Sequence, residues 1–508
     1  MRAWVFVTGI VAIAGLDFVV LSGGPAAIPA LVAVFALLAA GIGRLDRGRV
    51  ETAAAISAPP WFDPRERSTP MRRVDYVAAG LIGASSFALS FAGYWSPRGN
   101  MCWTVGTLSR CGIFDELYFA RAGEEYLQNL RIYENTHPPL SKLLVTLSMM
   151  LFGGMPAGDN PYGWRFLDVA FGAAAVVVLY ALVKRVTGST VFASIAAVAL
   201  SLDGMHFVQS RVATPEGFVV FFATFATYAL YRFLMEARAE NPARMWLVLF
   251  AVGLGCLVST KWYGVMGFGV SFLALGALKF LRPGGFRVGG AFVTIALVSA
   301  AVYWVSWVPD LVRQSPDPNE IHNLNDVLDR QLTMFHYHDT LRATHPYSSK
   351  WWEWPLDYVP VAYFYEDRRE NKDDPAACCI YEITSLANPV ILWFGLLSVP
   401  VAGWLAIAKR NTGYSLIVLT YLMQWLPWME SPRITFAYHF YVDIPLICAC
   451  NAIVLQRIKR FSLVASGAYV AAAAAAFVFF YPILSAHGLS WSAWHSRMWF
   501  PTWIIGPG

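Results

Sequence analysis

Long apolar runs, separated by short polar connections, dominate the chain from end to end. A helix that crosses a bilayer needs about 20 mostly apolar residues. Runs of that kind occupy roughly residues 3–22, 27–43, 76–95, 164–183, 190–209, 216–235, 245–260, 262–281, 288–309, 389–408, 412–429, 436–455 and 462–482. Because a second run follows the first at once, we interpret the first as a retained span rather than a signal peptide. The pattern predicts an all-α polytopic membrane protein with about 13 transmembrane helices.

One further apolar run, Leu140–Phe152, decides the topology. It is too short for a span and carries Lys142 near its start, so it is more typical of an interfacial or re-entrant segment. If it does not cross and the N-terminus is cytoplasmic, the connections rich in Arg and Lys all fall inside, as the positive-inside rule requires. We therefore expect a cytoplasmic N-terminus and an external C-terminus.

Two large loops then lie outside, at about residues 96–163 and 310–388. Connections of that length are uncommon unless they are functional. In the first loop, Phe119, Ala122, Tyr126 and Leu130 recur on one helical face. Together with the run 140–152, this spacing predicts interfacial amphipathic helices that lie on the outer surface.

Composition supports this class. Only 14% of the residues are charged and 57% are hydrophobic, with a mean hydropathy of +0.48. Soluble chains carry about 25% charged residues, so soluble globular, disordered and coiled-coil classes are excluded. The net charge of +5 does not indicate a nucleic-acid partner.

The seven cysteines include no CxxC pair, so neither a zinc site nor a thioredoxin-type motif is indicated. Cys102 and Cys111 both fall in the first outer loop, on the oxidising side, and we expect a disulfide between them. Cys378 and Cys379 are adjacent, and because a bond between neighbours is strained we predict none there.

Ionisable residues that are costly at membrane depth gather on the predicted outer side, and such residues mark functional sites by default. They are Asp115, Glu116, His137, Arg165, Arg211, Glu216, Lys261, His345, Lys350, Arg433 and His439. An acidic pair beside the membrane offers a general base for a hydroxyl nucleophile. Several Arg and Lys residues at the same level offer a clamp for a phosphate. The combination indicates an in-line displacement at a sugar carbon, with a lipid-linked phosphate as leaving group.

Several of these residues also have a purely structural interpretation. Asp115 either caps a helix that starts at Glu116 or acts as a base. Arg165 and Arg433 stand at span ends, where they either snorkel to the interface or bind a ligand. Lys261 is harder to explain in this way, because it lies between two apolar runs with no long loop to expose it.

Other polar residues carry weaker signals. His336 and His338 suggest a metal only weakly, because no third ligand is near them in the sequence. Asp168, Asp203 and Asp443 fall inside predicted spans, where they are either buried structural groups or the lining of a polar cavity. Asp115 and Glu116 make a thin site for a divalent cation, so we expect that no metal or other cofactor is required, with such a cation as the alternative.

The ordered motifs resemble a known family. They are FDELYFARAGEEYL, THPPLSKLL, GWRF, SRVATPEGFVVFF, GLGCLVSTKWYG, HPYSSKWWEWP and YLMQWLPW. Over about residues 76–456 the chain resembles the dolichyl- or polyprenyl-phosphate-mannose protein O-mannosyltransferases, which have the C-type membrane glycosyltransferase fold. The absence of room for a β-trefoil module in 310–388 is typical of a bacterial member.

The resemblance implies roles for individual residues. Asp115, with Glu116, corresponds to the family's acidic pair, and the Asp is the base toward a Ser or Thr hydroxyl. The implied binding residues for the donor and its phosphate are Arg165, Arg211, Lys261, His137 and Glu216, although relatives commonly carry Asp where Glu216 stands. We expect His345, Lys350, Trp351 and Arg433 to contribute from the outer loop and the start of span twelve.

The expected organisation has four parts. Residues 1–75 form two extra N-terminal helices and a cytoplasmic loop, 76–309 the catalytic module, 310–388 a large outer loop, and 389–508 a C-terminal four-helix region with an outer tail. The expected partners are a polyprenyl-phosphate-linked sugar, an exported protein acceptor and membrane lipids, in the inner membrane of a bacterium with the site facing outward. The oligomeric state is left open.

The alternatives are transfer of another lipid-linked sugar to a lipid or glycan, and secondary transport. Transporters favour repeated halves and midplane sites, which the sequence does not display.

Overall fold

The computed structural model describes residues 66–504, with gaps at 67, 95, 98, 153–160, 239–243, 282–287, 314, 432 and 459–460. The two predicted spans at 3–22 and 27–43 lie outside the described residues. Within the described part the chain is mostly helical, and every other predicted span falls on one helix or on two consecutive helices.

Seven described helical segments are long and apolar enough to cross a membrane. They are α3 (Arg73–Phe91), α6 (Tyr162–Thr187), α9 (Pro215–Arg238), α12 (Val288–Val305) continued by α13 (Val308–Val312), α15 (Pro389–Ala408), η4 (Ala437–Asp443) continued by α17 (Ile444–Arg457), and α18 (Ser462–Leu484). The other apolar segments are shorter helices, namely α7 (Thr190–Ser201) with α8 (Gly204–Gln209), α10 (Arg244–Thr260), η1 (Trp262–Val265) with α11 (Met266–Leu281), and α16 (Thr412–Trp425) with η3 (Leu426–Glu430). The count of 13 is therefore not confirmed.

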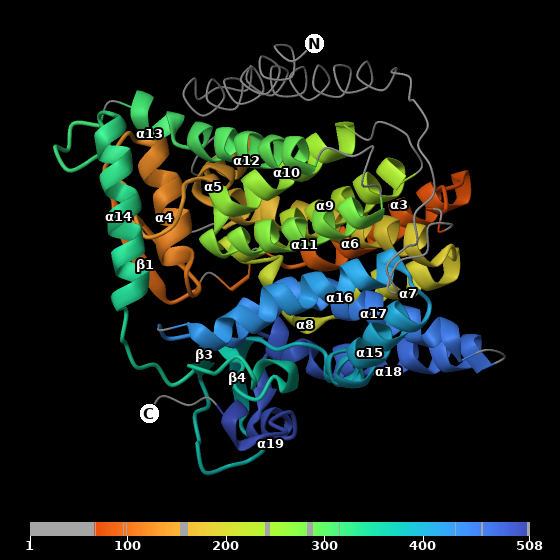
Figure 1. Cartoon of the computed structure of the whole chain (residues 1–508). Coiled ribbons are helices and arrows are strands. Elements are labelled where there is room, and N and C mark those ends of the chain that lie inside the picture. The colour runs from red at the N-terminus through yellow and green to blue at the C-terminus, as the bar shows by residue number, and fades with distance from the viewer. Residues whose placement is uncertain are drawn as a thin grey trace.

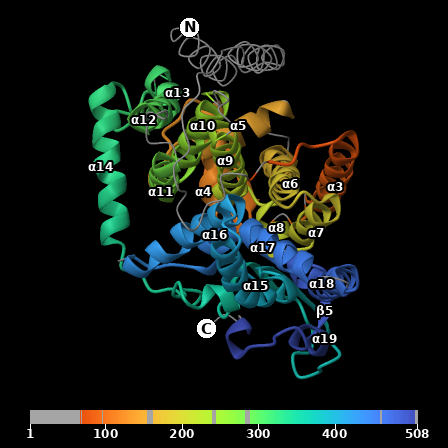
Figure 2. The same cartoon turned by 45° about the vertical axis from the view of Figure 1, so that its right-hand side comes forward.

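The long helices pack side by side in two groups (Figures 1 and 2). In the first group α9 packs against both α6 and α10, and α3 packs on α6. In the second, α17 lies among α7, α15, α16 and α18. The small residues Ala449, Cys450 and Ala452 are completely buried in α17, which lets its neighbours approach closely. A single core cluster runs through both groups.

The predicted cytoplasmic connections meet at one end of the bundle. Thr69 donates its N–H to the carbonyl of Arg185, Gln456 donates to the carbonyl of Thr187, and Arg457 donates to the hydroxyl of Tyr414. These residues are far apart in the sequence, so the basic connections before α3, between α6 and α7, before α16 and after α17 lie together.

The segment 140–152 differs from its prediction. Helix α5 (Leu140–Leu151) does not lie on a surface; Leu140–Met149 are all buried, and α5 packs between α4 (Glu116–Leu127) and α6. Its 12 residues are too few for a span, and neighbouring helices cover it up to Met149, while Leu151 at its end is exposed. In α4 the predicted inward face is correct for Phe119, Ala122 and Tyr126, whereas Leu130 lies beyond the end of the helix.

The second outer loop is more structured than expected. It contains α14 (Leu324–Thr340), which stands across the ends of the long helices (Figure 1). It also contains η2 (Trp354–Leu356) and strands β3 (Val361–Asp367) and β4 (Cys378–Ser385). β4 pairs with β3 on one side and with β5 (Leu489–Ser490) on the other, so β3 is an edge strand.

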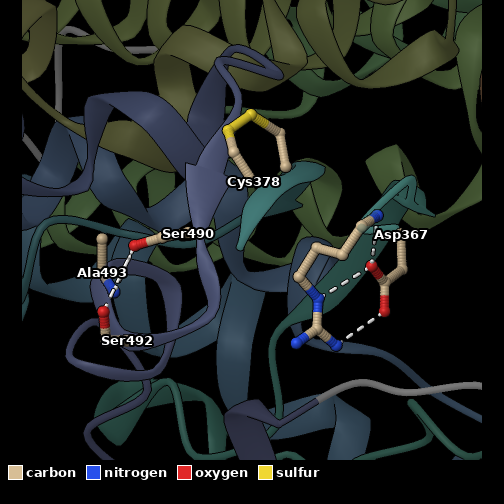
Figure 3. Close-up of a disulfide and its surroundings, with 7 residues drawn as sticks. Asp367, Cys378, Ser490, Ser492 and Ala493 are labelled. Atoms are coloured by element: carbon tan, nitrogen blue, oxygen red, sulfur yellow. Dashed lines mark hydrogen bonds and ion pairs between the residues drawn. A yellow bond between two sulfur atoms is a disulfide. The ribbon is translucent and has the colours of Figure 1, made fainter. Parts of the chain in front are cut away.

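Two disulfides lie in outer segments. The predicted Cys102–Cys111 bond joins directly opposite positions of the hairpin β1 (Met101–Val105) and β2 (Leu108–Gly112). The absence of a bond between Cys378 and Cys379 was a wrong prediction. These neighbours are joined at the start of β4, close to Ser490 (Figure 3), and their Cα atoms lie 3.0 Å apart because the peptide bond between them is cis.

Candidate active site

A cavity of about 1040 Å³ opens on the outer-loop side of the molecule. Its wall combines the start of α4, the segment 133–137, the end of α14, strand β3 and the segment 433–439. It gathers seven of the predicted site residues, namely Asp115, His137, Glu216, Lys261, His345, Arg433 and His439. Glu116, Arg165, Arg211, Lys350 and Trp351 do not line it.

Asp115 occupies the N-cap position of α4, but its side chain makes no capping hydrogen bond. The residue before it, Phe114, has a left-handed backbone with φ 49°, which is uncommon for a non-glycine residue. The ring of Phe114 stacks on Tyr363 of β3 with 4.0 Å between centroids, and this packing holds the turn in place. The carboxylate of Asp115 is therefore left to line the cavity.

The electrostatic surroundings of Asp115 suit proton transfer. Burial, with a further contribution from Glu216, raises the pKa of Asp115 to about 7, although Lys261 opposes the shift. A general base works best when its pKa lies near the operating pH. Asp115 is thus a carboxyl group that exchanges a proton near neutrality.

Glu116 points away from the cavity and is completely buried. Its carboxylate receives two hydrogen bonds from Arg165, of 2.6 and 2.7 Å, and two more from the backbone N–H groups of Ile113 and Ala213. The guanidinium of Arg165 also donates to the carbonyls of Tyr94 and Pro97. Arg165 therefore holds Glu116 and the loops around Asp115, and no nitrogen of its guanidinium faces the cavity unengaged.

Lys261 and Glu216 form an ion pair on the cavity wall. Lys261 follows the end of α10 in an extended conformation, which carries its ammonium group to the carboxylate of Glu216. Its ammonium also lies 5.4 Å from the ring centroid of Tyr438. Glu216 stands in the first turn of α9, where the helix dipole favours a carboxylate.

The His-Pro-Pro segment is anchored by a buried charge pair that the sequence reasoning missed. Lys142 of α5 donates to the carboxylate of Glu134 at 2.8 Å, and to the carbonyls of Glu134 and His137. The Glu134 carboxylate also contacts Nδ1 of His137 at 3.0 Å. Burial opposes ionisation, but Lys142, followed by His137, outweighs it and holds the pKa of Glu134 well below its usual range. Lys142 is thus an anchor for the loop.

His338 of α14 connects Arg433 to the same loop. Nε2 of His338 donates to the carbonyl of Thr136 at 2.8 Å, and Nδ1 accepts from Nη1 of Arg433. Burial, with smaller contributions from His137 and Arg433, lowers the pKa of His338 to about 4. The ring is therefore neutral at physiological pH and orients Arg433 without competing for an anion.

The remaining predicted residues have other surroundings. Arg211 is buried, donates to the carbonyl of Ala92 and stacks over Phe207. Trp351 is half-buried and packs against Trp425 at the margin of the core, and Lys350 is exposed. His345 lines the cavity and accepts from the N–H of Tyr347.

The acidic residues predicted inside spans, Asp168, Asp203 and Asp443, were expected to be either buried structural groups or the lining of a polar cavity. The contacts of Asp203 show a structural role. Asp203 caps α8 by accepting from the N–H of His206, and it also accepts from the N–H of Asn388. Asp168 and Asp443 are buried and do not line the cavity. Among the described residues no group of three or more His, Cys, Asp or Glu side chains has a metal-binding arrangement.

The chain matches two models of one protein family. Residues 103–287 match the dolichyl-phosphate-mannose-protein mannosyltransferase family, and residues 323–503 match the C-terminal four-transmembrane region of protein O-mannosyltransferases. The chain belongs to the protein O-mannosyltransferase family. The resemblance carried by the sequence motifs is thereby confirmed.

Individual relatives agree. The chain is 27% identical over 474 residues to the polyprenol-phosphate-mannose–protein mannosyltransferase of Mycobacterium tuberculosis, covering 78% of this chain and 88% of the relative. It is 27% identical over 517 residues to the enzyme of the same name from Mycolicibacterium smegmatis, covering 88% and 95%.

Solved structures confirm the C-type glycosyltransferase fold. The sugar-donor-bound protein O-mannosyltransferase complex of Saccharomyces cerevisiae superposes with a TM-score of 0.71 at 12% identity, covering 85% of this chain and 93% of that chain. ArnT from Cupriavidus metallidurans, solved with undecaprenyl phosphate, gives a TM-score of 0.50 at 15% identity, covering 81% and 66%. The predicted fold class is therefore confirmed, with two small sheets that the sequence did not predict.

Proposed function

We propose that this member of the family transfers mannose from polyprenyl-phosphate-mannose to Ser or Thr hydroxyls of exported proteins, with inversion at the sugar carbon. The supporting observation is that one cavity brings together Asp115, Lys261 and Arg433. The carboxyl group of Asp115 makes no helix-capping hydrogen bond and has a pKa of about 7. The cavity volume of about 1040 Å³ lies at the upper end of ordinary ligand pockets and leaves room for a sugar phosphate beside an acceptor.

In the proposed reaction the acceptor hydroxyl gives its proton to the carboxylate of Asp115 while its oxygen attacks the anomeric carbon. The bond between that carbon and the phosphate oxygen breaks, and its electron pair leaves with the polyprenyl phosphate. Charge that develops on the leaving phosphate is stabilised by cations already in place. Glu116 and Arg165 contribute by fixing the loop that carries Asp115.

Arg433 is the better candidate than Arg165 or Arg211 for the donor phosphate. Its guanidinium lines the cavity and contacts the neutral ring of His338 and the carbonyl of Ile434, with no carboxylate partner among the described residues. Lys261, in contrast, is paired with Glu216 and must share its charge with that residue. A guanidinium also matches phosphate geometry better than an ammonium group does.

The proposed location is the inner membrane of a bacterium, with the cavity facing the periplasm or exterior. The clustering of the basic connections at the opposite end of the bundle supports this orientation. The expectation that no metal is required stays a prediction, and transfer assayed with and without EDTA tests it.

The decisive experiment uses Asp115→Asn in proteoliposomes supplied with polyprenyl-phosphate-mannose and a Thr-containing peptide. We expect transfer to fall by about 10²–10⁴-fold, because the amide cannot take the proton. Asp329→Asn is the matched control, since Asp329 is an exposed carboxylate on α14. Full activity of a folded Asp115→Asn enzyme would overturn the role of Asp115, and labelling of lipid or glycan alone would overturn the protein acceptor.

A further inference from the structure

Strand β3 presents an unpaired edge to the cavity. The three-stranded sheet has the order β3-β4-β5, so only one side of β3 is occupied. No hydrogen bond joins the backbone of Ala362–Tyr365 to any described segment other than β4. Edge strands are templates for pairing with another chain, and proteins normally cover or interrupt them.

The edge, rather than one face of the strand, borders the cavity. Four consecutive residues, Ala362, Tyr363, Phe364 and Tyr365, all line it. The register of β3 against β4 shifts between Ala362 and Phe364, so the alternation of side chains is interrupted at Tyr363. In the regular part of the strand successive side chains point to opposite faces, and a cavity against one face would be lined by alternate residues only. Phe364 and Tyr365 are consecutive, pair with β4 in regular register and both line the cavity, which places the backbone flank of β3 at the cavity wall there.

This edge lies beside the residue that carries the base. The ring of Tyr363 stacks on Phe114, the direct neighbour of Asp115, with 4.0 Å between centroids and 5° between planes. Leu341 and His345 belong to a segment without regular structure that forms another part of the cavity wall. A chain laid along β3 would therefore pass the carboxylate of Asp115.

We propose that the acceptor polypeptide binds as an extended strand along the free edge of β3, which carries one of its hydroxyl side chains to Asp115. The proposal rests on the function proposed above and specifies how its acceptor is held. Main-chain pairing supplies affinity that does not depend on the acceptor sequence, and pockets for alternate side chains supply selectivity. Only an unfolded or locally extended segment can pair in this way.

The test changes the acceptor and leaves the enzyme intact. Peptides with one Thr receive a single backbone ester in place of an amide at each position from three before to three after the Thr. An ester removes one N–H donor and keeps every side chain. In strand pairing alternate residues direct their N–H groups to the partner, so we expect KM for the peptide to rise roughly three- to tenfold at alternate positions and little between them.

Position-specific crosslinking gives an independent readout. Peptides that carry a benzophenone side chain two residues from the Thr should form adducts on Ala362–Tyr365 of the wild-type enzyme. Unlabelled peptide should compete these adducts away, and a scrambled peptide that lacks Ser and Thr is the matched control for capture without turnover.

The outcomes separate the two proposals. An alternating ester profile with adducts on β3 supports strand pairing. A parent peptide that is mannosylated while every ester behaves alike, or whose adducts map only to 341–347, overturns strand pairing and leaves the function standing. A parent peptide that is never mannosylated overturns both, and a dimer of the enzyme that crosslinks through β3 and excludes the peptide overturns the acceptor as occupant of this edge.

Discussion

Arg165 donates to both carboxylate oxygens of Glu116, and water has almost no access to either side chain, which are 1% and 0% exposed. The pair ties α4 to the start of α6, and Glu116 extends the tie to the turn before α9 through the N–H of Ala213. Asp115 directly precedes Glu116, so the position of the proposed base depends on this contact.

Breaking the pair should therefore destabilise the enzyme as well as inactivate it. Glu116→Gln and Arg165→Gln each leave an uncompensated buried charge, which costs about 3–5 kcal/mol in free energy of unfolding. Denaturation in detergent micelles, followed by tryptophan fluorescence, measures the change.

Glu366→Gln is the matched control for that experiment. Glu366 pairs with Arg368 at 2.8 Å, but these side chains are 37% and 64% exposed, so the loss should be within about 1 kcal/mol. If Arg165→Gln kept wild-type stability and lost only affinity for the donor, Arg165 would be a phosphate ligand, as the family resemblance implied.

The pH dependence of transfer should report Asp115. Only the carboxylate accepts a proton, and burial raises the pKa of Asp115 to about 7. The rate should therefore rise about tenfold per pH unit below that value and level off above it. A profile already flat from pH 5 to 8 in proteoliposomes would contradict this assignment.

The raised pKa of Asp115 also makes the stability of the folded enzyme depend on pH. Stability should fall as the pH rises, whereas the transfer rate should increase. A carboxyl group whose pKa is raised on folding favours the protonated form, so its contribution is present below the unfolded pKa and is lost as the pH rises through about 7. Asp115→Asn should accordingly raise the melting temperature at pH 8 more than at pH 5. Asp329→Asn, on the exposed side of α14, should show no such difference.

The fold could be predicted where the signal is local. Runs of apolar residues predicted the helices, and alternation of loops with basic and acidic residues predicted which ends lie together. Helix α5 could not be placed, because its apolar composition fits an interface and a protein interior equally well. What decides is the tertiary packing of α4 and α6 around it.

The candidate site follows the same division. Asp115, His137, Glu216, Lys261, His345 and Arg433 were predicted from motifs and meet in the cavity. The orientation of Arg165 was not predictable, since a buried pair and a ligand-binding cation look alike in a sequence. His338 was considered only as a weak metal-ligand candidate without a third ligand nearby. Its role could not be predicted, because its partners, Thr136 and Arg433, lie 202 and 95 positions away.

The Cys102–Cys111 disulfide should stabilise the hairpin that packs against α4. Loop-closure entropy for so short a loop predicts a loss of roughly 2–3 kcal/mol when Cys111 is replaced by Ser. Trp103 of the same hairpin donates to Glu124 in α4, so loosening the hairpin should also reduce transfer. Intact mass before and after reduction checks the bond, and Cys256→Ser, at a free thiol, is the control.

The contact between His338 and Arg433 gives the sharpest test of the proposed phosphate site. Asn at position 338 places an amide oxygen near the former Nδ1, so His338→Asn can still accept from Arg433. Gln places an amide nitrogen near the former Nε2, so His338→Gln keeps only the bond to the carbonyl of Thr136.

If His338 orients Arg433 for donor binding, the two variants should differ in KM for the donor. His338→Gln loses a hydrogen bond to a charged group, worth about 1.5–3 kcal/mol, and should raise KM for polyprenyl-phosphate-mannose roughly 10–100-fold. Loss of uniform binding leaves kcat largely unchanged. His338→Asn should stay within a few-fold of wild type, as should His336→Gln on the exposed side of the same helix.

The pH dependence of transfer by the two His338 variants is a further check. Because burial lowers the pKa of His338 to about 4, its ring stays neutral across the assay range, and both variants should keep the inflection near pH 7 that belongs to Asp115. Equal KM values for His338→Asn and His338→Gln, beside a clear defect in Arg433→Gln, would show that Arg433 binds the donor without help from His338.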